Sequence, residues 1–332
     1  MSLYKAETRR LVKRRFTRFF VLLTVLVLGL VAAGVAYSNE KVTPASLQAA
    51  QARADSSFAE DTKSAERDRA DCATNPSRYG GDCDNLWTPS KDDYQAANYL
   101  TSQFDFRDSF PAMLITLAAL LALVAFVIGA SFVGAEWNSG GMMNLLLWRP
   151  QRVRVLSTKL AALLVSLTGL TVVVGAAWTG LFWLIANLRG TTERMTSGVW
   201  QSIGLMGLRG LALVLVAGAI GFAVASIGRH TAAALGAAIG VIVVFQFGLA
   251  IVLELARARF YEAYLLPAWF VAWMFKSYEV YDTYGPCEYS ATDGCTPASF
   301  TITWQLSGSV VAGLTIIIVG AAMWTMRKRD IT

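Results

Sequence analysis

Few side chains in this sequence could carry covalent or metal chemistry: one histidine, His230, and four cysteines, Cys72, Cys83, Cys287 and Cys295. The sequence contains no GxxxxGK[ST] segment, so it lacks the phosphate-binding loop of Walker-type ATPases. His230 lies in a short polar segment between two apolar runs, apart from most of the acidic residues, so no Ser-His-Asp grouping can be drawn. We therefore expect a protein that has no catalytic residues and binds no metal or cofactor itself.

The spacing of the cysteines favours two local disulfides, Cys72–Cys83 and Cys287–Cys295. Each pair would close a short loop within one polar segment, which is typical of proteins in an oxidising compartment. Free thiols and a four-cysteine zinc site are the alternatives. The zinc site is disfavoured because no CxxC spacing is present and the two segments would have to converge.

Recognition of a partner is indicated by the segment from Glu136 to Lys159. It begins with an acid and small residues, continues through the apolar run Leu145–Leu147, and reaches Pro150 before a basic cluster. This order predicts a short helix at a membrane surface that the proline ends. Because the residues that follow are basic, we expect this helix to face the cytosol and to touch a partner there.

The elements that would position these residues are membrane-spanning helices. Hydrophobic residues make up 55% of the sequence and charged residues 16%, whereas a soluble domain carries about 25% charged residues. Six apolar runs are each long enough to cross a hydrocarbon core of about 30 Å. They lie at about 19–38, 109–134, 160–187, 203–227, 231–254 and 303–326. The predicted fold is an all-α integral membrane protein with one transmembrane domain over residues 1–332.

Basic residues indicate the orientation of the chain. They gather at the N-terminus, after the second span, at Arg229 and in the C-terminal tail, and an even number of spans puts all four places on one side. That side is expected to be cytoplasmic, with both termini there, in the plasma (inner) membrane. The segments 39–108 and 255–302 then lie outside and contain all four cysteines, which suits disulfides. Anionic lipid accounts for the net charge of +6 without nucleic acid.

The segments outside the spans have predicted structures of their own. Residues 1–18 are expected to form an amphipathic interfacial helix. The apolar residues that would share one side of it are Leu3, Leu11, Val12 and Phe16. In the first outer segment, Pro44 to Ala70 has helix-forming composition. In the second, Tyr261 to Tyr284 is rich in aromatic residues and is expected to form two short helices around Pro267 at the outer interface.

Three polar or small-residue features inside the spans can each be interpreted in two ways. Arg209 in the fourth span is either a functional charge or a side chain that reaches the outer headgroups. Gln246 in the fifth span either lines a path through the membrane or bonds a neighbouring helix. Gly236 and Gly240 form a small-residue face that permits close helix contact, within the chain or with a second copy.

Six spans, a basic interfacial helix before the first and a Glu-led helix between the second and third resemble the permease subunit of ABC-2 type ATP-binding cassette exporters. In that family the loop reads acid, small residues, glycine, an apolar run, proline, basic residues and then a lysine at the next span. The corresponding residues here are Glu136, Gly140, Gly141, Leu145–Leu147, Pro150, Arg152 and Lys159. The wording EWNSGGMMNLLLWRP and the cysteine-bearing first outer segment resemble the actinobacterial branch.

The resemblance implies a division of labour between two kinds of subunit. Residues 135–155 would carry a coupling helix that docks in a cleft of a separate ATPase, and the turn at Arg229-His230 would be a second, smaller contact. The coupling residues that it implies are Glu136, Trp137, Gly140, Gly141, Met143, Leu146 and Arg149. Two permeases, identical or paralogous, and two ATPases would form the working unit, with ATP and Mg²⁺ bound by the ATPases.

The resemblance implies outward transport. Because the spans carry few charges, we expect an amphipathic or apolar cargo, such as a peptide antibiotic, a drug or a lipid. In a dimer, the second and fifth spans of both copies would line a central path that aromatic residues close outside. The candidate path residues are Phe126, Phe245, Gln246, Leu249, Trp269, Phe270 and Trp273. The alternatives are a non-transporting sensor or scaffold that uses its outer segments as a receptor, and a lipid-modifying enzyme, for which catalytic groups are lacking.

Overall fold

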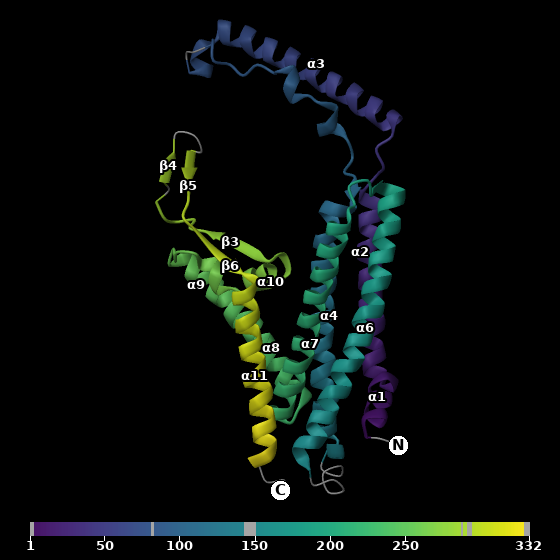
Figure 1. Ribbon diagram of the computed structural model, residues 1–332. Coiled ribbons are helices and arrows are strands. Elements are labelled where there is room, and N and C mark those ends of the chain that lie inside the picture. The colour runs from purple at the N-terminus through teal and green to yellow at the C-terminus, as the bar shows by residue number, and fades with distance from the viewer. Residues whose placement is uncertain (1–2, 81–82, 143–150, 287, 291–293, 329–332) are drawn as a thin grey trace. The chain divides into compact units, whose positions relative to one another are not determined.

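The computed structural model describes residues 3–80, 83–142, 151–286, 288–290 and 294–328 (Figure 1). Within these residues, six helical segments are long and apolar enough to cross a membrane. Their bounds are Arg15–Ser38 (α2), Phe106–Asn138 (α4), Arg152–Arg189 (α6), Ser197–Gly228 (α7), Thr231–Leu255 and Trp304–Lys328 (α11). The predicted all-α membrane fold with six spans is confirmed.

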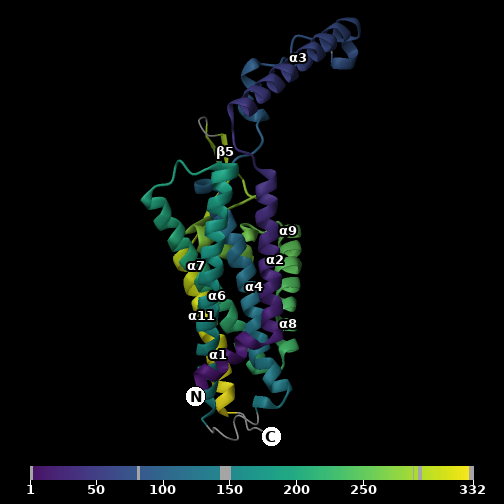
Figure 2. The same cartoon turned by 90° about the vertical axis from the view of Figure 1, so that its right-hand side faces the viewer.

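Contacts divide the chain into two compact units. The first contains Met1–Leu30, Ser109–Gly180 and Met195–Thr332, and the second contains Val31–Asp108 and Leu181–Arg194. In the first unit, the beginning of α1 (Leu3–Lys13) and the end of α11 lie at the same end, as Figures 1 and 2 show. We call this the basic end, and we define it by Arg10, Arg14, Arg229 and Arg327.

The N-terminal segment differs from its prediction. A single interfacial helix was expected over residues 1–18, but α1 ends at Lys13 and α2 begins at Arg15. Phe16 therefore belongs to a different helix from Leu11, and Val12 is exposed while Leu11 is buried. The predicted helix is therefore present but shorter than expected, and α1 buries the charged residue Glu7 together with Leu11.

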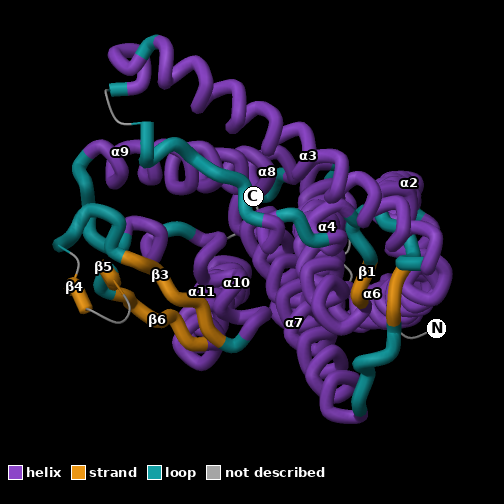
Figure 3. Tube along the Cα trace, turned by 90° about the horizontal axis from the view of Figure 1, so that it is seen from above, coloured by secondary structure: helices purple, strands orange, loops and turns teal. Residues whose placement is uncertain are grey.

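The central helix of the first unit is α7, which packs against α11 and against α10 (Leu266–Phe275), as seen from above in Figure 3. It also crosses α4 with direct backbone contact. A Cβ atom at Gly129 would collide with the carbonyl of Gly218, and one at Gly221 would collide with the carbonyl of Phe126. Glycine at this crossing therefore lets the two helices approach more closely than any larger residue would allow.

The fifth span is not a single regular α-helix. Helix α8 (Thr231–Gly240) passes into a π-helical segment, Val241–Gly248, and then into α9 (Leu249–Leu255). π-helical turns are rare and often occur at functional places. Within the described chain, none of the most apolar 18-residue window of this span is buried. A Cβ atom at Gly236 or Gly240 would also meet nothing within 4 Å.

Between the fifth and sixth spans lies an element that combines α10 with a two-stranded antiparallel sheet. β3 (Ser277–Tyr281) pairs with β6 (Ser299–Thr303), with Val280 opposite Phe300 and Tyr278 opposite Ile302 (Figure 3). Buried Ala268 and Ala272 of α10 pack on Val280 and Ile302. We call α10, β3 and β6 the α10–sheet element. A second hairpin joins β4 (Glu288–Ser290) to β5 (Gly294–Thr296).

The aromatic segment that forms this element was predicted correctly only in part. A short 3-10 helix, Tyr261–Tyr264, precedes Pro267, and Pro267 lies in the first turn of α10, where its missing N–H costs no hydrogen bond. After Phe275 the prediction of helix was wrong. The alternating side chains of Ser277–Tyr281 bury Val280 against α10, so this stretch forms a strand.

The second unit contains the long helix α3 (Pro44–Thr74), which confirms the helix predicted from composition at Pro44 to Ala70. Thr43 caps its first turn through a reciprocal hydrogen bond with Ser46. The chain after α3 returns along it, and Tyr94 donates a hydrogen bond of 2.5 Å to Asp61. This bond raises the pKa of Tyr94 to about 12, because ionising the hydroxyl would lose it beside a carboxylate.

A disulfide closes the end of α3. The predicted bond between Cys72 and Cys83 is present, with a Cα–Cα distance of 5.9 Å. The other predicted bond, Cys287–Cys295, involves Cys287, which lies outside the described residues. In the same unit, β1 (Phe104–Asp105) pairs in parallel with β2 (Gly190–Thr191), and Arg194 forms ion pairs with Asp105 and Asp108.

We predict that replacing both Cys72 and Cys83 by serine lowers the local stability of the α3 C-terminus by about 3 kcal/mol, the chain-entropy value for an 11-residue loop. Amide hydrogen exchange should quicken near residues 66–79 and stay unchanged near the capped start of α3. Reduction of the unsubstituted protein serves as the matched control and should give the same pattern. Unaltered exchange near residues 66–79 would contradict a stabilising role for this bond.

We also predict that the α10–sheet element loosens in acid. Buried Asp282 accepts a hydrogen bond of 2.6 Å from Arg259 Nε and further bonds from the amides of Tyr284 and Gly285. The Arg259 bond, aided by those amides, holds the pKa of Asp282 below its usual value despite burial. Stability from this carboxylate is therefore complete above the unfolded-state pKa and is lost as pH falls through the lower folded-state pKa.

Hydrogen exchange of Ser277–Tyr281 measured against pH tests this prediction. Protection should fall in that acid range in the unsubstituted protein. In Asp282→Asn, protection should be lower at neutral pH and should no longer respond to acid in that range. An identical pH response in the two proteins would show that Asp282 is not the responsible group.

Candidate coupling site

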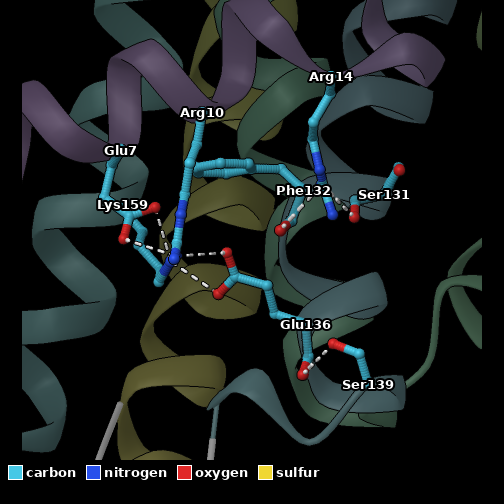
Figure 4. Close-up of polar contacts among 8 residues, drawn as sticks. All are labelled: Glu7, Arg10, Arg14, Ser131, Phe132, Glu136, Ser139 and Lys159. Carbon is cyan, nitrogen blue, oxygen red and sulfur yellow. Dashed lines mark hydrogen bonds and ion pairs between the residues drawn. The ribbon is translucent and has the colours of Figure 1, made fainter. Parts of the chain in front are cut away.

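A buried group of charges joins three helices at the basic end. Lys159 of α6 is fully buried, and its Nζ lies 2.8 Å from Glu7 Oε2 of α1 and 2.7 Å from Glu136 Oε2 of α4 (Figure 4). The Glu7 side chain is only 2% exposed. We call Glu7, Glu136 and Lys159 the buried triad. It brings together residues that are 152 positions apart in the sequence.

A second cation balances the triad from its solvent side. Arg10 Nη1 lies 3.9 Å from Glu7 Oε1 and 3.9 Å from Glu136 Oε1, and its side chain is 66% exposed. Two carboxylates are thus matched by two cations. Removing ions from water costs several kcal/mol each, so the buried arrangement is stable only while each charge keeps its partners.

The chain between α1 and α2 adds contacts to α4. Arg14 Nη1 donates hydrogen bonds to the carbonyls of Ser131 at 3.0 Å and Phe132 at 3.4 Å (Figure 4). The Phe132 ring lies between two cations, 5.3 Å from Lys159 Nζ and 6.0 Å from Arg14 Cζ. Such cation–π contacts stabilise most where water is excluded. The N-terminal segment is therefore fixed to the last two turns of α4 through both charge and packing.

Glu136 and Trp137 do not begin a separate helix, as was predicted, but form the last turn of α4, which ends at Asn138. The helix stops because Gly140 adopts φ +69°, which favours glycine. Helical geometry resumes at Gly141 and Met142, and Met142 is buried. The predicted site residues Met143, Leu146 and Arg149 lie outside the described residues, as does most of the expected coupling helix.

The second predicted contact, the turn at Arg229-His230, lies beside the end of α4. The Arg229 guanidinium is 5.1 Å from the centre of a Trp137 ring. A Cβ atom at Gly134 would collide with Thr231, so the turn and α4 touch closely. His230 Nδ1 accepts a hydrogen bond of 3.1 Å from the amide of Ala232 and so caps the start of α8. The structure therefore brings the two predicted contact regions together.

Comparison with known proteins identifies the family of the whole chain. A family model described as "ABC-2 family transporter protein" matches residues 1–330. The chain belongs to the ABC-2 transporter family. No curated protein and no solved structure matches the chain. With six spans, it is a multi-pass membrane protein and a membrane transport subunit, and membership of the family implies an ABC ATPase as its partner.

In this ABC-2 transporter, the triad connects the two helices that flank residues 139–151. Glu136 lies two residues before the end of α4, and Lys159 lies in the second turn of α6. Glu7 links both to α1. The arrangement is a network of opposite charges between three helices. What it can do is hold the flanks of the connecting segment in one geometry, so that they move together.

The predicted cargo-path residues fall in three places within the first unit. Phe126 lies at the crossing of α4 with α7, where its carbonyl meets Gly221. Phe245, Gln246 and Leu249 lie on the fifth span, and Phe245 is exposed. The remaining residues lie on α10: Trp269, Phe270 and Trp273.

Hydrogen bonds explain several of these side chains. Gln246 Oε1 accepts a bond of 3.1 Å from the amide of Leu266, the first residue of α10, which favours the interpretation that Gln246 bonds a neighbouring helix. Trp273 Nε1 donates a bond of 2.9 Å to the carbonyl of Arg209. Arg209 Nη1 in turn donates to the carbonyl of Met274 at 3.3 Å, and its guanidinium lies 5.2 Å from a Trp304 ring. Arg209 thus ties α7 to α10 and α11.

The sequence interpretation missed half of this site. Lys159 was recognised only as part of a loop pattern, Arg10 and Arg14 counted only as part of the basic N-terminus, and Glu7 and Phe132 were not assigned a role. One signal for Glu7 is visible in the sequence, because it is the only acidic residue among the first 39 and stands within a basic segment. A lone acid in such a segment predicts a specific partner, although the sequence does not identify it.

We predict that Lys159→Met destabilises the protein by about 3–5 kcal/mol, because it leaves two carboxylates buried beside each other. Thermal unfolding followed by size-exclusion fluorescence measures the change. Lys13→Met, which removes an exposed charge from α1, is the matched control and should have little effect. Adding Glu7→Gln and Glu136→Gln to Lys159→Met should restore most of the stability, since no buried charge then lacks a partner and the Arg10 side chain is exposed to solvent. A Lys159→Met protein as stable as Lys13→Met would contradict this account.

Proposed function

We propose that this chain is the permease subunit of an ATP-driven exporter that moves an amphipathic or apolar cargo out of the cell. Two permeases, as identical or paralogous copies, work with two ATPase subunits, which bind ATP and Mg²⁺. The basic end lies in the cytoplasm, and the protein resides in the plasma membrane. That the chain is a membrane transport subunit follows from its family, and the cargo, direction, subunit numbers and orientation are what we propose.

The buried triad carries the proposal for how the subunits are coupled. A movement of the ATPase has to reach the spans through a stiff connection, because a flexible loop would absorb it. Lys159 and Glu136 fix both flanks of residues 139–151, and Glu7 adds the N-terminal helix to the same body. The Arg229 turn is attached to this body through Trp137, so it moves with it. Displacement of the loop is then a rigid-body displacement of α4, α6 and α7.

The proposed orientation of the chain and the proposed cargo rest on charge, whereas the outward direction rests on the family resemblance. Lys and Arg residues prefer the cytoplasmic side of a membrane protein, so we place the basic end in the cytoplasm. Arg209, a charge within an apolar span, already has partners in α10 and α11. Cargo without strong charge suits such spans, because a charged cargo needs opposite charges along its path.

The fifth span supports a second permease copy. Within the described chain its most apolar window has no buried residue, and Gly236 and Gly240 leave open space beside them. Small residues at this spacing allow another helix to approach closely. A second copy of the same span is the partner that a two-fold symmetric pair would supply.

The test uses the triple variant Glu7→Gln, Glu136→Gln and Lys159→Met, in which the triad is uncharged. The protein is expressed with its ABC ATPase, and efflux of fluorescent amphipathic dyes is measured in vesicles. We predict that the complex still assembles and that transport per ATP hydrolysed falls about tenfold, equivalent to about 1.4 kcal/mol of lost coupling. Lys13→Met should transport normally.

Each outcome bears on a different step. Full transport by an assembled triple variant would contradict the coupling role of the triad. If the unsubstituted chain binds no ATPase and shows no ATP-dependent efflux, the exporter proposal fails, and a non-transporting sensor or scaffold becomes the better description.

A further inference from the structure

The geometry points to a lipid-binding groove in the first unit, formed by α4, α6 and α7, that holds one acyl chain of a membrane lipid. The groove has a volume of about 330 Å³. Its walls come from the second, third and fourth spans and from Met274 of α10, and none of its described lining residues is a candidate residue of the predicted cargo path. This inference does not depend on the ATPase or on the identity of the cargo.

The floor of the groove is buried and its rim is exposed. The floor contains Leu117 and Leu121 of α4 and Met206 of α7, all of which are buried. The rim contains Val172 of α6 and Leu208 of α7, which are 57% and 62% exposed. The groove therefore opens on the outer flanks of α6 and α7. In a membrane-spanning protein, such exposed apolar side chains lie in the hydrocarbon of the bilayer.

Small residues create the space. Gly175 of α6 and Gly204 and Gly207 of α7 line the groove, and a Cβ atom at any of them would meet nothing within 4 Å. This differs from Gly129, where a Cβ atom would collide with the backbone of α7. The glycines at the α4–α7 crossing let two helices touch, whereas Gly175, Gly204 and Gly207 leave the groove open because they have no side chain to fill it.

The lining has the chemistry of a hydrocarbon site. None of the described lining residues is charged. Thr179 donates its hydroxyl to the carbonyl of Gly175 at 2.9 Å, so this polar group is satisfied within α6. Thr171 Oγ1 is buried and has no hydrogen-bond partner among the described residues, but this one hydroxyl alone does not supply the roughly two to four polar partners that an ordered water needs. Apolar cavities of this kind stay dry and accept hydrocarbon.

Size and access select the occupant. The volume of about 330 Å³ is about twice that of an apolar cavity of about 150 Å³ that binds benzene, so the groove has room for a longer hydrocarbon segment. The molecule that offers such a chain at the rim is bilayer lipid, which surrounds α6 and α7 at very high concentration. A water-soluble ligand would have to cross the hydrocarbon to reach the same opening. Lipid is therefore the occupant that the position of the groove favours over an exported compound.

Photo-crosslinking tests this inference in nanodiscs that contain a phospholipid with a photoreactive group in its acyl chain. In the unsubstituted protein, crosslinks mapped by mass spectrometry should concentrate on groove residues such as Thr171 and Met206. Gly207→Leu and Gly175→Leu fill the groove from two different helices and should each lower those crosslinks about tenfold. Gly169→Leu, an exposed and equally open position on α6 outside the groove, is the matched control and should leave them unchanged.

Three results would overturn the inference. The first is uniform labelling along the exposed faces of α6 and α7, with no concentration in the groove. The second is strong groove labelling in both filled variants, provided that they elute and unfold like the control. The third is preferential labelling by a photoreactive amphipathic dye that excludes the phospholipid probe, which would assign the groove to cargo.

Discussion

The arrangement of the basic end depends on one buried ammonium group. Lys159 is without solvent exposure, and an isolated charge in such a place would cost far more than a folded protein can lose. It is stable because Glu7 and Glu136 both approach within 2.8 Å. The positions of α1, the end of α4 and the start of α6 are thereby fixed together. Movement of one of these helices alone would separate the buried Lys159 from at least one of its two carboxylate partners.

Helix α7 extends this constraint toward the α10–sheet element. At one end, Arg229 stacks on Trp137, the residue next to Glu136. Farther along, Gly218 and Gly221 touch the backbone of α4, and Arg209 is bonded to α10 through Met274 and Trp273. A helix of 32 residues spans about 48 Å at about 1.5 Å per residue. A single stiff rod therefore contacts both the coupling site and the element at the opposite end of the first unit.

The sequence predicted what hydropathy and charge determine locally: six spans, the helix in the first outer segment and the disulfide Cys72–Cys83. It did not predict where Glu136 points, since an acid at a span end looks like a surface residue until its distant partner is known. The same limit applies to Ser277–Tyr281. Its aromatic residues suggested an interfacial helix, but the segment forms a strand because this conformation buries Val280 against Ala272. In both cases the deciding interaction is tertiary, so spacing along the chain does not contain it.

Two polar residues with open roles have a common physical explanation. The first turn of a helix leaves amide groups without partners inside the helix, and such groups are costly where water is scarce. His230 accepts from the amide of Ala232 at the start of α8, and Gln246 accepts from the amide of Leu266 at the start of α10. Each polar side chain thus satisfies a donor where the chain begins a new helix. The hydrogen bond from the Leu266 amide to Gln246 also joins the π-helical segment of the fifth span to α10. One bond thus satisfies the first amide of α10 and attaches α10 to the fifth span.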